Sequence, residues 1–297
     1  MPRWLIWTLL ALAFWGAWAL LAKVIGDALT PTQSQVLSTI GMVPVIVGVA
    51  FSKNLGAVGT RVRGSILAFA AGLLGSLGNI VYYGLLNSGA KAATVIPFTA
   101  MYPLITVLLA VLFLNEKLNR IQLFGVVLSF LAIYLFNVPQ EHRVVSTWLA
   151  VALVPVMLWG VAGLLQKIST NSISGELSTL WFLAAFVPVA FCLFAREPLP
   201  ARIEPRTWLF VILLGLTLAL GNFAILLAFA SQGKASIIAP LSGLYPMVSI
   251  PIAIVILRER IGLRESFGIV VALAAVAAIS MESKAPAPAP IPTHTQA

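Results

Sequence analysis

Ten long apolar segments make up most of this chain, and the short connections between them hold most of its charged residues. A helix needs about 20 apolar residues to cross the hydrocarbon core of a bilayer. Of the 297 residues, 60% are hydrophobic and only 9% are charged, which is too few charges to cover the surface of a soluble domain. We therefore expect an all-α, polytopic membrane protein rather than a soluble enzyme. The ten expected transmembrane helices span approximately 4–23, 33–52, 65–86, 93–114, 121–138, 148–167, 177–195, 208–230, 236–257 and 266–281.

An internal repeat relates the two halves of the chain. Trp15-Gly16 recurs 144 residues later as Trp159-Gly160, and Lys23 recurs at the same distance as Lys167. Trp, Asn, Lys, Tyr and Glu are scarce in apolar sequence, so their recurrence is informative where that of Ala or Leu is not. Further pairs, each 143 residues apart, are Gly78-Asn79 and Gly221-Asn222, Lys91 and Lys234, Tyr102-Pro103 and Tyr245-Pro246, and Glu116 and Glu259.

Each repeat contains five of the expected helices. Because five is odd, the second copy enters the membrane from the opposite side, and the two repeats are inverted. Inverted repeats recur in secondary transporters, where the two halves exchange conformations and the site opens to either face in turn. The repeat therefore favours alternating access around a site near the bilayer midplane.

On these residues the chain resembles the drug/metabolite transporter superfamily, and within it the EamA-type group. The resemblance rests on Trp15-Gly16 with Lys23, on Trp159-Gly160 with Lys167, and on a proline followed by a glutamate thirteen residues later in both halves. It implies ten helices in two inverted five-helix repeats, residues 1–140 and 141–281. The resemblance leaves out the Pro/Ala-rich tail, 282–297, which we expect from its composition to be disordered. It also implies export of small organic metabolites such as amino acids, without specifying the substrate.

Scarce polar and aromatic residues gather at one depth. Counted from the span centres at 1.5 Å per residue, the repeated Trp-Gly, Asn and Tyr-Pro pairs all fall near mid-membrane. Tyr83 lies one turn after Asn79 and shares its helix face, whereas its partner position in the second repeat is Leu226. The candidate substrate-binding residues are Trp15, Asn79, Tyr83, Tyr102, Trp159, Asn222 and Tyr245.

Each candidate also has a structural interpretation. The asparagines could bond a neighbouring helix instead of lining a pathway, and the tryptophans could pack in the core or face lipid. Pro103 and Pro246 are expected to bend their helices, which could serve a gate or only the fold.

The candidate charges lie at the ends of the spans. Lys23 and Lys167 either snorkel to the headgroups or face a vestibule and attract a substrate carboxylate. Glu116 and Glu259 fit a structural charge cluster better than a proton-coupling site, because neither lies at mid-membrane.

No Asp, Glu, Lys, Arg or His lies deep in any expected span, so the sequence predicts a cavity of uncharged polar and aromatic groups. His142 and His294 lack metal-ligand spacing, and no ATP-binding motif is present, so we expect neither metal nor cofactor. Cys192 is the single cysteine, and we expect it to be a buried, inert thiol.

Orientation follows from the distribution of Lys and Arg. In the first half they favour a cytoplasmic N-terminus, whereas in the second half they favour the opposite, and the totals tie at nine on each side. Letting the first half decide, we expect both termini in the cytoplasm and the protein in the cell (plasma or inner) membrane.

Three function classes compete. A secondary transporter of small molecules is the first; a non-transporting receptor, scaffold or channel is the alternative. A membrane-embedded enzyme is disfavoured because no span contains a base or metal cluster to activate a nucleophile, so we expect no catalytic residues. The expected partners are a small-molecule substrate and the lipid bilayer, with no nucleic acid, and the protein as a monomer or homodimer.

Overall fold

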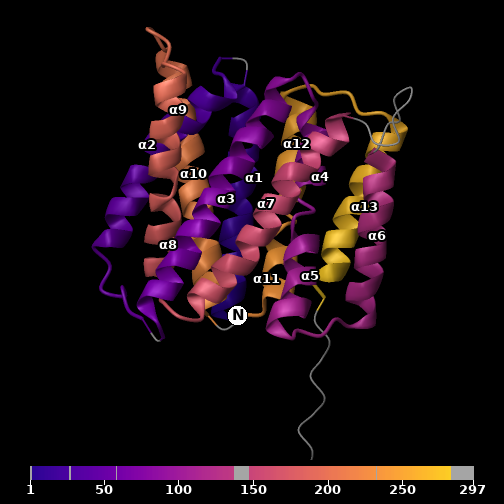
Figure 1. Cartoon of the computed structure of the whole chain (residues 1–297). Coiled ribbons are helices and arrows are strands. Elements are labelled where there is room, and N and C mark those ends of the chain that lie inside the picture. The colour runs from indigo at the N-terminus through magenta and orange to yellow at the C-terminus, as the bar shows by residue number, and fades with distance from the viewer. Residues whose placement is uncertain (1, 27, 58, 137–146, 232, 282–297) are drawn as a thin grey trace, which may run out of the picture.

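The protein is all-α, as expected, and its helices stand side by side as a bundle (Figure 1). The computed structural model describes residues 2–26, 28–57, 59–136, 147–231 and 233–281. The thirteen helices of this described part are α1 Arg3–Ile25, α2 Pro31–Ala50, α3 Arg61–Asn87, α4 Ala92–Thr99, α5 Pro103–Leu114, α6 Arg120–Phe136, α7 Thr147–Thr170, α8 Gly175–Ala184, α9 Phe186–Arg196, α10 Pro205–Ala230, α11 Ala235–Ser242, α12 Pro246–Ile256 and α13 Leu263–Ile279.

Three expected spans are interrupted, each forming a pair of consecutive helices: α4–α5, α8–α9 and α11–α12. Counting each pair as one segment, the described part contains eight helical segments that are long and apolar enough to cross a membrane. The fifth and tenth expected spans, α6 and α13, have 17 residues each. The expected count of ten transmembrane helices is therefore not confirmed. The expected tail, 282–297, lies outside the described residues.

The two halves of the bundle run in opposite directions. Lys23 near the end of α1 donates to Leu86 O near the end of α3, so α1 and α3 end on the same face. Ser169 near the end of α7 donates to Gly64 O at the start of α3, so α7 ends on the opposite face. Equivalent helices of the two repeats thus point in opposite directions, as inverted repeats require.

Proline residues stand at two of the interruptions. α5 begins at Pro103 and α12 begins at Pro246, each directly after a tyrosine. Proline has no N–H to continue the helix that precedes it, and the turns before it close with short-range bonds, Tyr102 N to Thr99 O and Tyr245 N to Ser242 O. Both prolines therefore interrupt their helices in the interior of the bundle.

Glycines bring the repeats into close contact at equivalent places. A Cβ at Gly72 of α3 would overlap Phe182 O of α8, and a Cβ at Gly215 of α10 would overlap Ser38 O of α2. These contacts fix α3 and α10 beside the helices of the other half. Cys192, by contrast, is exposed on α9, so the expectation of a buried thiol was wrong; an apolar outer surface facing lipid accommodates it.

Candidate functional site: a central aromatic cavity

A cavity of about 60 Å³ lies in the interior, where α1, α3, α7, α10 and the α8–α9 pair meet the interruptions of α4–α5 and α11–α12. None of its lining side chains carries a formal charge. The wall consists of Trp15, Trp18, Gly75, Asn79, Tyr102, Trp159, Ala162, Gln166, Phe182, Phe186, Leu218, Asn222 and Tyr245.

Two tryptophans occupy equivalent positions on the wall. Trp15 of α1 packs where a side chain at Gly221 of α10 would stand, and Trp159 of α7 packs against Gly78 of α3 in the same way. The indole nitrogen of Trp159 donates to Gly75 O over 3.3 Å. Each tryptophan of the Trp-Gly pair thus reaches the cavity because the glycine of the Gly-Asn pair in the other repeat leaves room for it.

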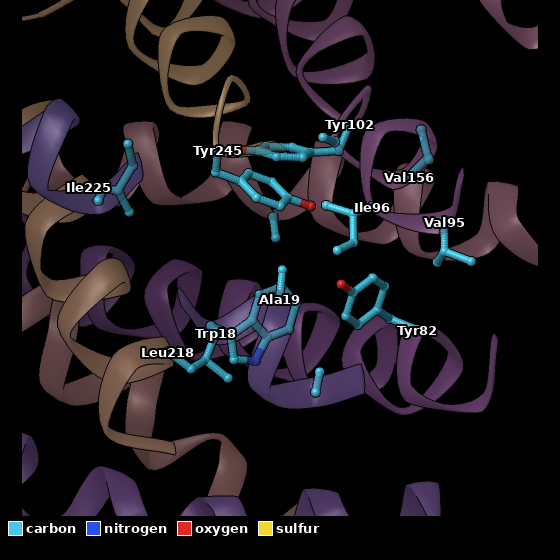
Figure 2. Packing of buried hydrophobic residues seen from close by; sticks show 14 of the residues in the cluster. Trp18, Ala19, Tyr82, Val95, Ile96, Tyr102, Val156, Leu218, Ile225 and Tyr245 are labelled. Atoms are coloured by element: carbon cyan, nitrogen blue, oxygen red, sulfur yellow. The ribbon is translucent and has the colours of Figure 1, made fainter. Parts of the chain in front are cut away.

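The two tyrosines at the helix interruptions approach each other from opposite repeats (Figure 2). The rings of Tyr102 and Tyr245 both stand edge-on to Trp15, with centroids 6.3 and 6.5 Å away. The Tyr102 hydroxyl shares a hydrogen bond of 3.0 Å with Ser242 Oγ. The Tyr245 hydroxyl is buried, and the side chain that it can bond is Thr99, which stands 143 residues before Ser242.

The two asparagines are equivalent by sequence but not by bonding. Asn222 accepts a hydrogen bond from Gln166 Nε2 at 3.3 Å and donates to Leu218 O at 2.9 Å. Asn79 is 3% exposed, and its Nδ2 has no partner. The cavity therefore contains one amide that is already paired and one whose donor is available.

The structure brings six of the seven candidate substrate-binding residues onto one wall and leaves Tyr83 outside it. The Tyr83 hydroxyl accepts a hydrogen bond from Trp18 Nε1 at 3.0 Å. Tyr83 thus positions a wall residue and does not form the wall. Whether the six residues bind a substrate stays a prediction.

Sequence reasoning missed half of the wall, including Trp18, Gln166, Phe182 and Phe186. A search for recurring residues could not find them, because their partner positions in the other repeat hold different residue types; Ala162, for example, is the partner of Trp18. One available signal was the spacing of Trp15 and Trp18, which are three residues apart and therefore share a helix face.

The lysines at the span ends bind backbone carbonyls and do not contribute to the cavity wall. Lys23 Nζ donates to Leu86 O and Ala90 O, at 3.1 and 3.0 Å. Lys167 Nζ donates to Phe229 O at 3.2 Å. Each lysine thus lies at the C-terminal end of α3 or α10, where the helix dipole favours a positive charge.

Glu116 and Glu259 bind the N-terminal ends of helices, whereas the two lysines bind C-terminal ends. Glu259 accepts from the backbone N–H groups of Ala92 and Ala93 at the start of α4, both at 2.8 Å. Glu116 accepts from Ala235 N and Ser236 N at the start of α11, at 3.2 and 3.0 Å. We name these contacts the Glu259 cap and the Glu116 cap.

The residue before each capping glutamate has a left-handed backbone conformation, which orients the glutamate toward its helix. Asn115 and Arg258 directly precede the glutamates and have φ angles of 54° and 53°. This conformation is uncommon for a residue with a side chain, and it ends α5 and turns the chain after α12. Because each glutamate caps a helix of the other repeat, the two caps join the halves at opposite faces of the bundle.

Among the described residues, no group of three or more His, Cys, Asp or Glu could hold a metal ion. The chemistry available at the wall is therefore hydrogen bonding by amides and hydroxyls, and contact with aromatic faces. His142 and His294 lie outside the described residues.

A family model of known proteins matches this chain twice. The EamA-like transporter family model covers residues 2–138 and again residues 146–281. The two matches correspond to the two halves described above.

Individual relatives are similar to this chain over part of its length. An uncharacterised protein of Methanocaldococcus jannaschii, MJ1333.1, is 29% identical over 130 residues, which cover 44% of this chain and 93% of that protein. The uncharacterised transporter YojE of Bacillus subtilis is 31% identical over 174 residues, 58% of this chain and 55% of YojE. A solved structure entitled only "Crystal structure of protein" has a TM-score of 0.67 at 18% identity, over 94% of this chain and 98% of that one, which shows a shared fold.

Proposed function

Because the chain belongs to the EamA-like transporter family, we propose that it is a secondary transporter that exports small organic metabolites, such as amino acids or related compounds, by alternating access. The observation that carries this proposal is the central cavity, whose wall pairs Trp15 with Trp159, Asn79 with Asn222 and Tyr102 with Tyr245. A site shared by two inverted halves can be exposed by either half in turn.

The surroundings of the cavity fit this mechanism. The Glu116 cap and the Glu259 cap hold the two interrupted segments at opposite faces of the bundle. If one cap opens while the other stays closed, the interruption beside the cavity can move on one face only. We further propose that all ten apolar segments cross the membrane, with α6 and α13 as its shortest spans, and that the protein works as a monomer or homodimer.

Flux through the purified protein tests the proposal. In proteoliposomes loaded with a labelled metabolite mixture, we expect saturable, gradient-driven efflux of at least one compound. Ala162→Leu should abolish most of this flux, because it places three more heavy atoms in a cavity of about 60 Å³. Val127→Leu, at an exposed position of α6, is the matched control and should transport like the parent.

The alternative is a non-transporting receptor, scaffold or channel. Flux that rises linearly with concentration would indicate a channel, and binding without flux would indicate a receptor. The absence of efflux for every compound would contradict the proposed function.

A further inference from the structure

A second hollow lies on the outer surface of the bundle, between α3 and α9, and it shares no residue with the central cavity. Its volume is about 340 Å³. Its walls are Leu73, Leu77 and Ile80 of α3 and Pro188, Val189, Cys192, Leu193 and Arg196 of α9. We name this hollow the α3–α9 groove.

The groove faces the hydrocarbon of the bilayer. Both of its walls belong to segments that are long and apolar enough to cross a membrane, Arg61–Asn87 and Gly175–Arg196. Leu77 is 46% exposed, and Cys192 is exposed as well. Because the surrounding solvent at this depth is lipid, an acyl chain can lie along the groove and cover its apolar walls.

One end of the groove carries its single charged side chain, Arg196. Arg196 is the last residue of the 22-residue segment Gly175–Arg196, which places it at the level of the lipid headgroups. Its side chain is exposed, and within the described part of the chain no carboxylate pairs with it. The adjacent carboxylate, Glu197, accepts a hydrogen bond from Thr30 Oγ1 at 2.7 Å. The guanidinium of Arg196 is therefore available, and guanidinium binds phosphate oxygens through two parallel hydrogen bonds.

The fold by itself does not require this charge. The carbonyls of Phe182 and Ser38 contact α3 and α10 in the same way, and these two residues are 144 residues apart. At the same distance, Ser52 just after α2 corresponds to Arg196 at the end of α9. A neutral residue thus occupies the equivalent place in the other repeat, so the cation belongs to one side of the bundle only.

We propose that the α3–α9 groove is a binding site for an anionic phospholipid. An acyl chain lies along the stripe formed by Leu73, Leu77 and Ile80, and the headgroup phosphate accepts hydrogen bonds from Arg196. A headgroup with a net negative charge balances Arg196, whereas a zwitterionic headgroup brings its own cation. The site is separate from the proposed transport pathway and does not depend on it.

Native mass spectrometry of the detergent-purified protein tests the preference. Phosphatidylglycerol (anionic) and phosphatidylcholine (zwitterionic) with identical acyl chains are titrated separately. We expect phosphatidylglycerol to bind the parent about fivefold more tightly, because its hydrogen bonds to Arg196 join opposite charges. Equal affinity of the two lipids for the parent overturns the proposal.

Two matched variants then assign the charge. Arg196→Gln should abolish the preference for phosphatidylglycerol. Arg202→Gln, which removes the same charge from the connection between α9 and α10 outside the groove, should keep it. The assignment is wrong if Arg196→Gln retains the preference or if Arg202→Gln loses it as well.

Cys192 locates the lipid, because it is the single cysteine of the chain and lies in the groove wall. Its alkylation by N-ethylmaleimide is followed by intact mass in vesicles of phosphatidylcholine, with and without phosphatidylglycerol. We expect phosphatidylglycerol to slow alkylation of the parent severalfold and to have a much smaller effect on Arg196→Gln. An anionic surface lowers the local pH for both proteins alike, so equal slowing of the two would place the lipid elsewhere and overturn the proposal.

A second copy of the chain is the competing occupant of the groove. It would appear in the mass spectrum as a dimer whose Cys192 is protected without added lipid, and this result also overturns the proposal. None of these outcomes bears on the proposed function, which is tested separately by efflux.

Discussion

At the residue scale, Asn79 and Asn222 occupy equivalent positions and have different bonds. Asn222 is fixed by Gln166 and Leu218 O, whereas the Asn79 donor has no partner. The repeat partner of Gln166 is Ala22, so the first repeat has no amide to pair with Asn79. The asymmetry therefore comes from one position where the duplicated sequences differ.

This difference predicts that two matched variants change different properties, one the stability of the protein and the other its transport affinity. Asn222→Ala leaves the buried Gln166 without its acceptor and should lower the free energy of unfolding by about 1–3 kcal/mol. Asn79→Ala breaks no bond made by its Nδ2 and should be near parent stability, while its transport affinity falls several-fold. Thermal unfolding and efflux kinetics of both variants check this. Equal destabilisation by the two changes would contradict the bonding described here.

At the element scale, the interrupted segments α4–α5 and α11–α12 combine a break beside the cavity with a capped helix start at one face. The Glu259 cap holds the start of α4 and the Glu116 cap holds the start of α11. Charged acceptors at helix N-termini gain from both hydrogen bonds and the helix dipole. Neutralising one glutamate should therefore release one face selectively.

We test this with Glu116→Gln and Glu259→Gln as a matched pair. In a Cys192→Ser background, a cysteine replacing Ala162 reports access to the cavity. Glu116→Gln should raise labelling by an impermeant reagent from the face that contains residue 60, and Glu259→Gln from the other face. Right-side-out and inside-out vesicles separate the two directions. If either variant raises labelling from both faces, the two caps do not each control access from one face.

A second contact at the element level concerns the start of α13. Glu265 pairs with Lys91 at 2.7 Å and accepts from Gly262 N. Partial burial raises the pKa of Glu265, but the hydrogen bonds from Lys91 and Gly262 and the charge of Lys91 outweigh burial, so the pKa lies below its ordinary value of 4.5. A lowered carboxyl pKa stabilises the folded state above the unfolded-state pKa, and that contribution disappears as the pH falls through the folded-state pKa.

Glu265→Gln should accordingly lower the unfolding temperature at neutral pH, and the difference from the parent should vanish in acid below the lowered pKa. Glu204→Gln is the control, because Glu204 is exposed and has no salt bridge in the described part of the chain. Thermal unfolding of the three proteins from neutral to strongly acidic pH measures the effect. A difference that persists or grows in acid would exclude this linkage.

At the scale of the whole molecule, both ends of the described bundle lie on one face. The start of α1 packs near Gly233, just after α10, and Asn119 before α6 donates to Met281 O after α13. Glu116, three residues before Asn119, caps the start of α11 on that same face. Figure 1 marks the N-terminus at this end of the bundle. An even number of crossings fits this arrangement.

The expected orientation places this face in the cytoplasm. In a Cys192→Ser background, Thr60→Cys and Ser283→Cys should resist an impermeant thiol reagent in intact cells and react after permeabilisation. Arg202→Cys, between α9 and α10, is the control that should react from outside. Strong external labelling at residue 60 or 283 would reverse the assignment.

The sequence by itself determined the helical class, the duplication and the family resemblance, and it predicted that the Trp-Gly, Asn and Tyr-Pro pairs lie at one level of the bundle. It could do so because the level of a residue depends on its distance along a helix, and proline can interrupt a helix, as at Pro103 and Pro246, although Pro44 and Pro155 lie within α2 and α7. Only the tertiary structure decided that Trp18 and Gln166 join the wall, that Tyr83 stays behind it, and that Lys23 and Lys167 bind helix ends. In a membrane, the lipid and the protein interior are both apolar, so the pattern of hydrophobic residues says little about which way a helix faces. The direction in which a side chain points and the hydrogen bonds that it makes depend on the neighbouring helix. That Asn79 Nδ2 has no hydrogen-bond partner therefore follows only from the arrangement of both repeats.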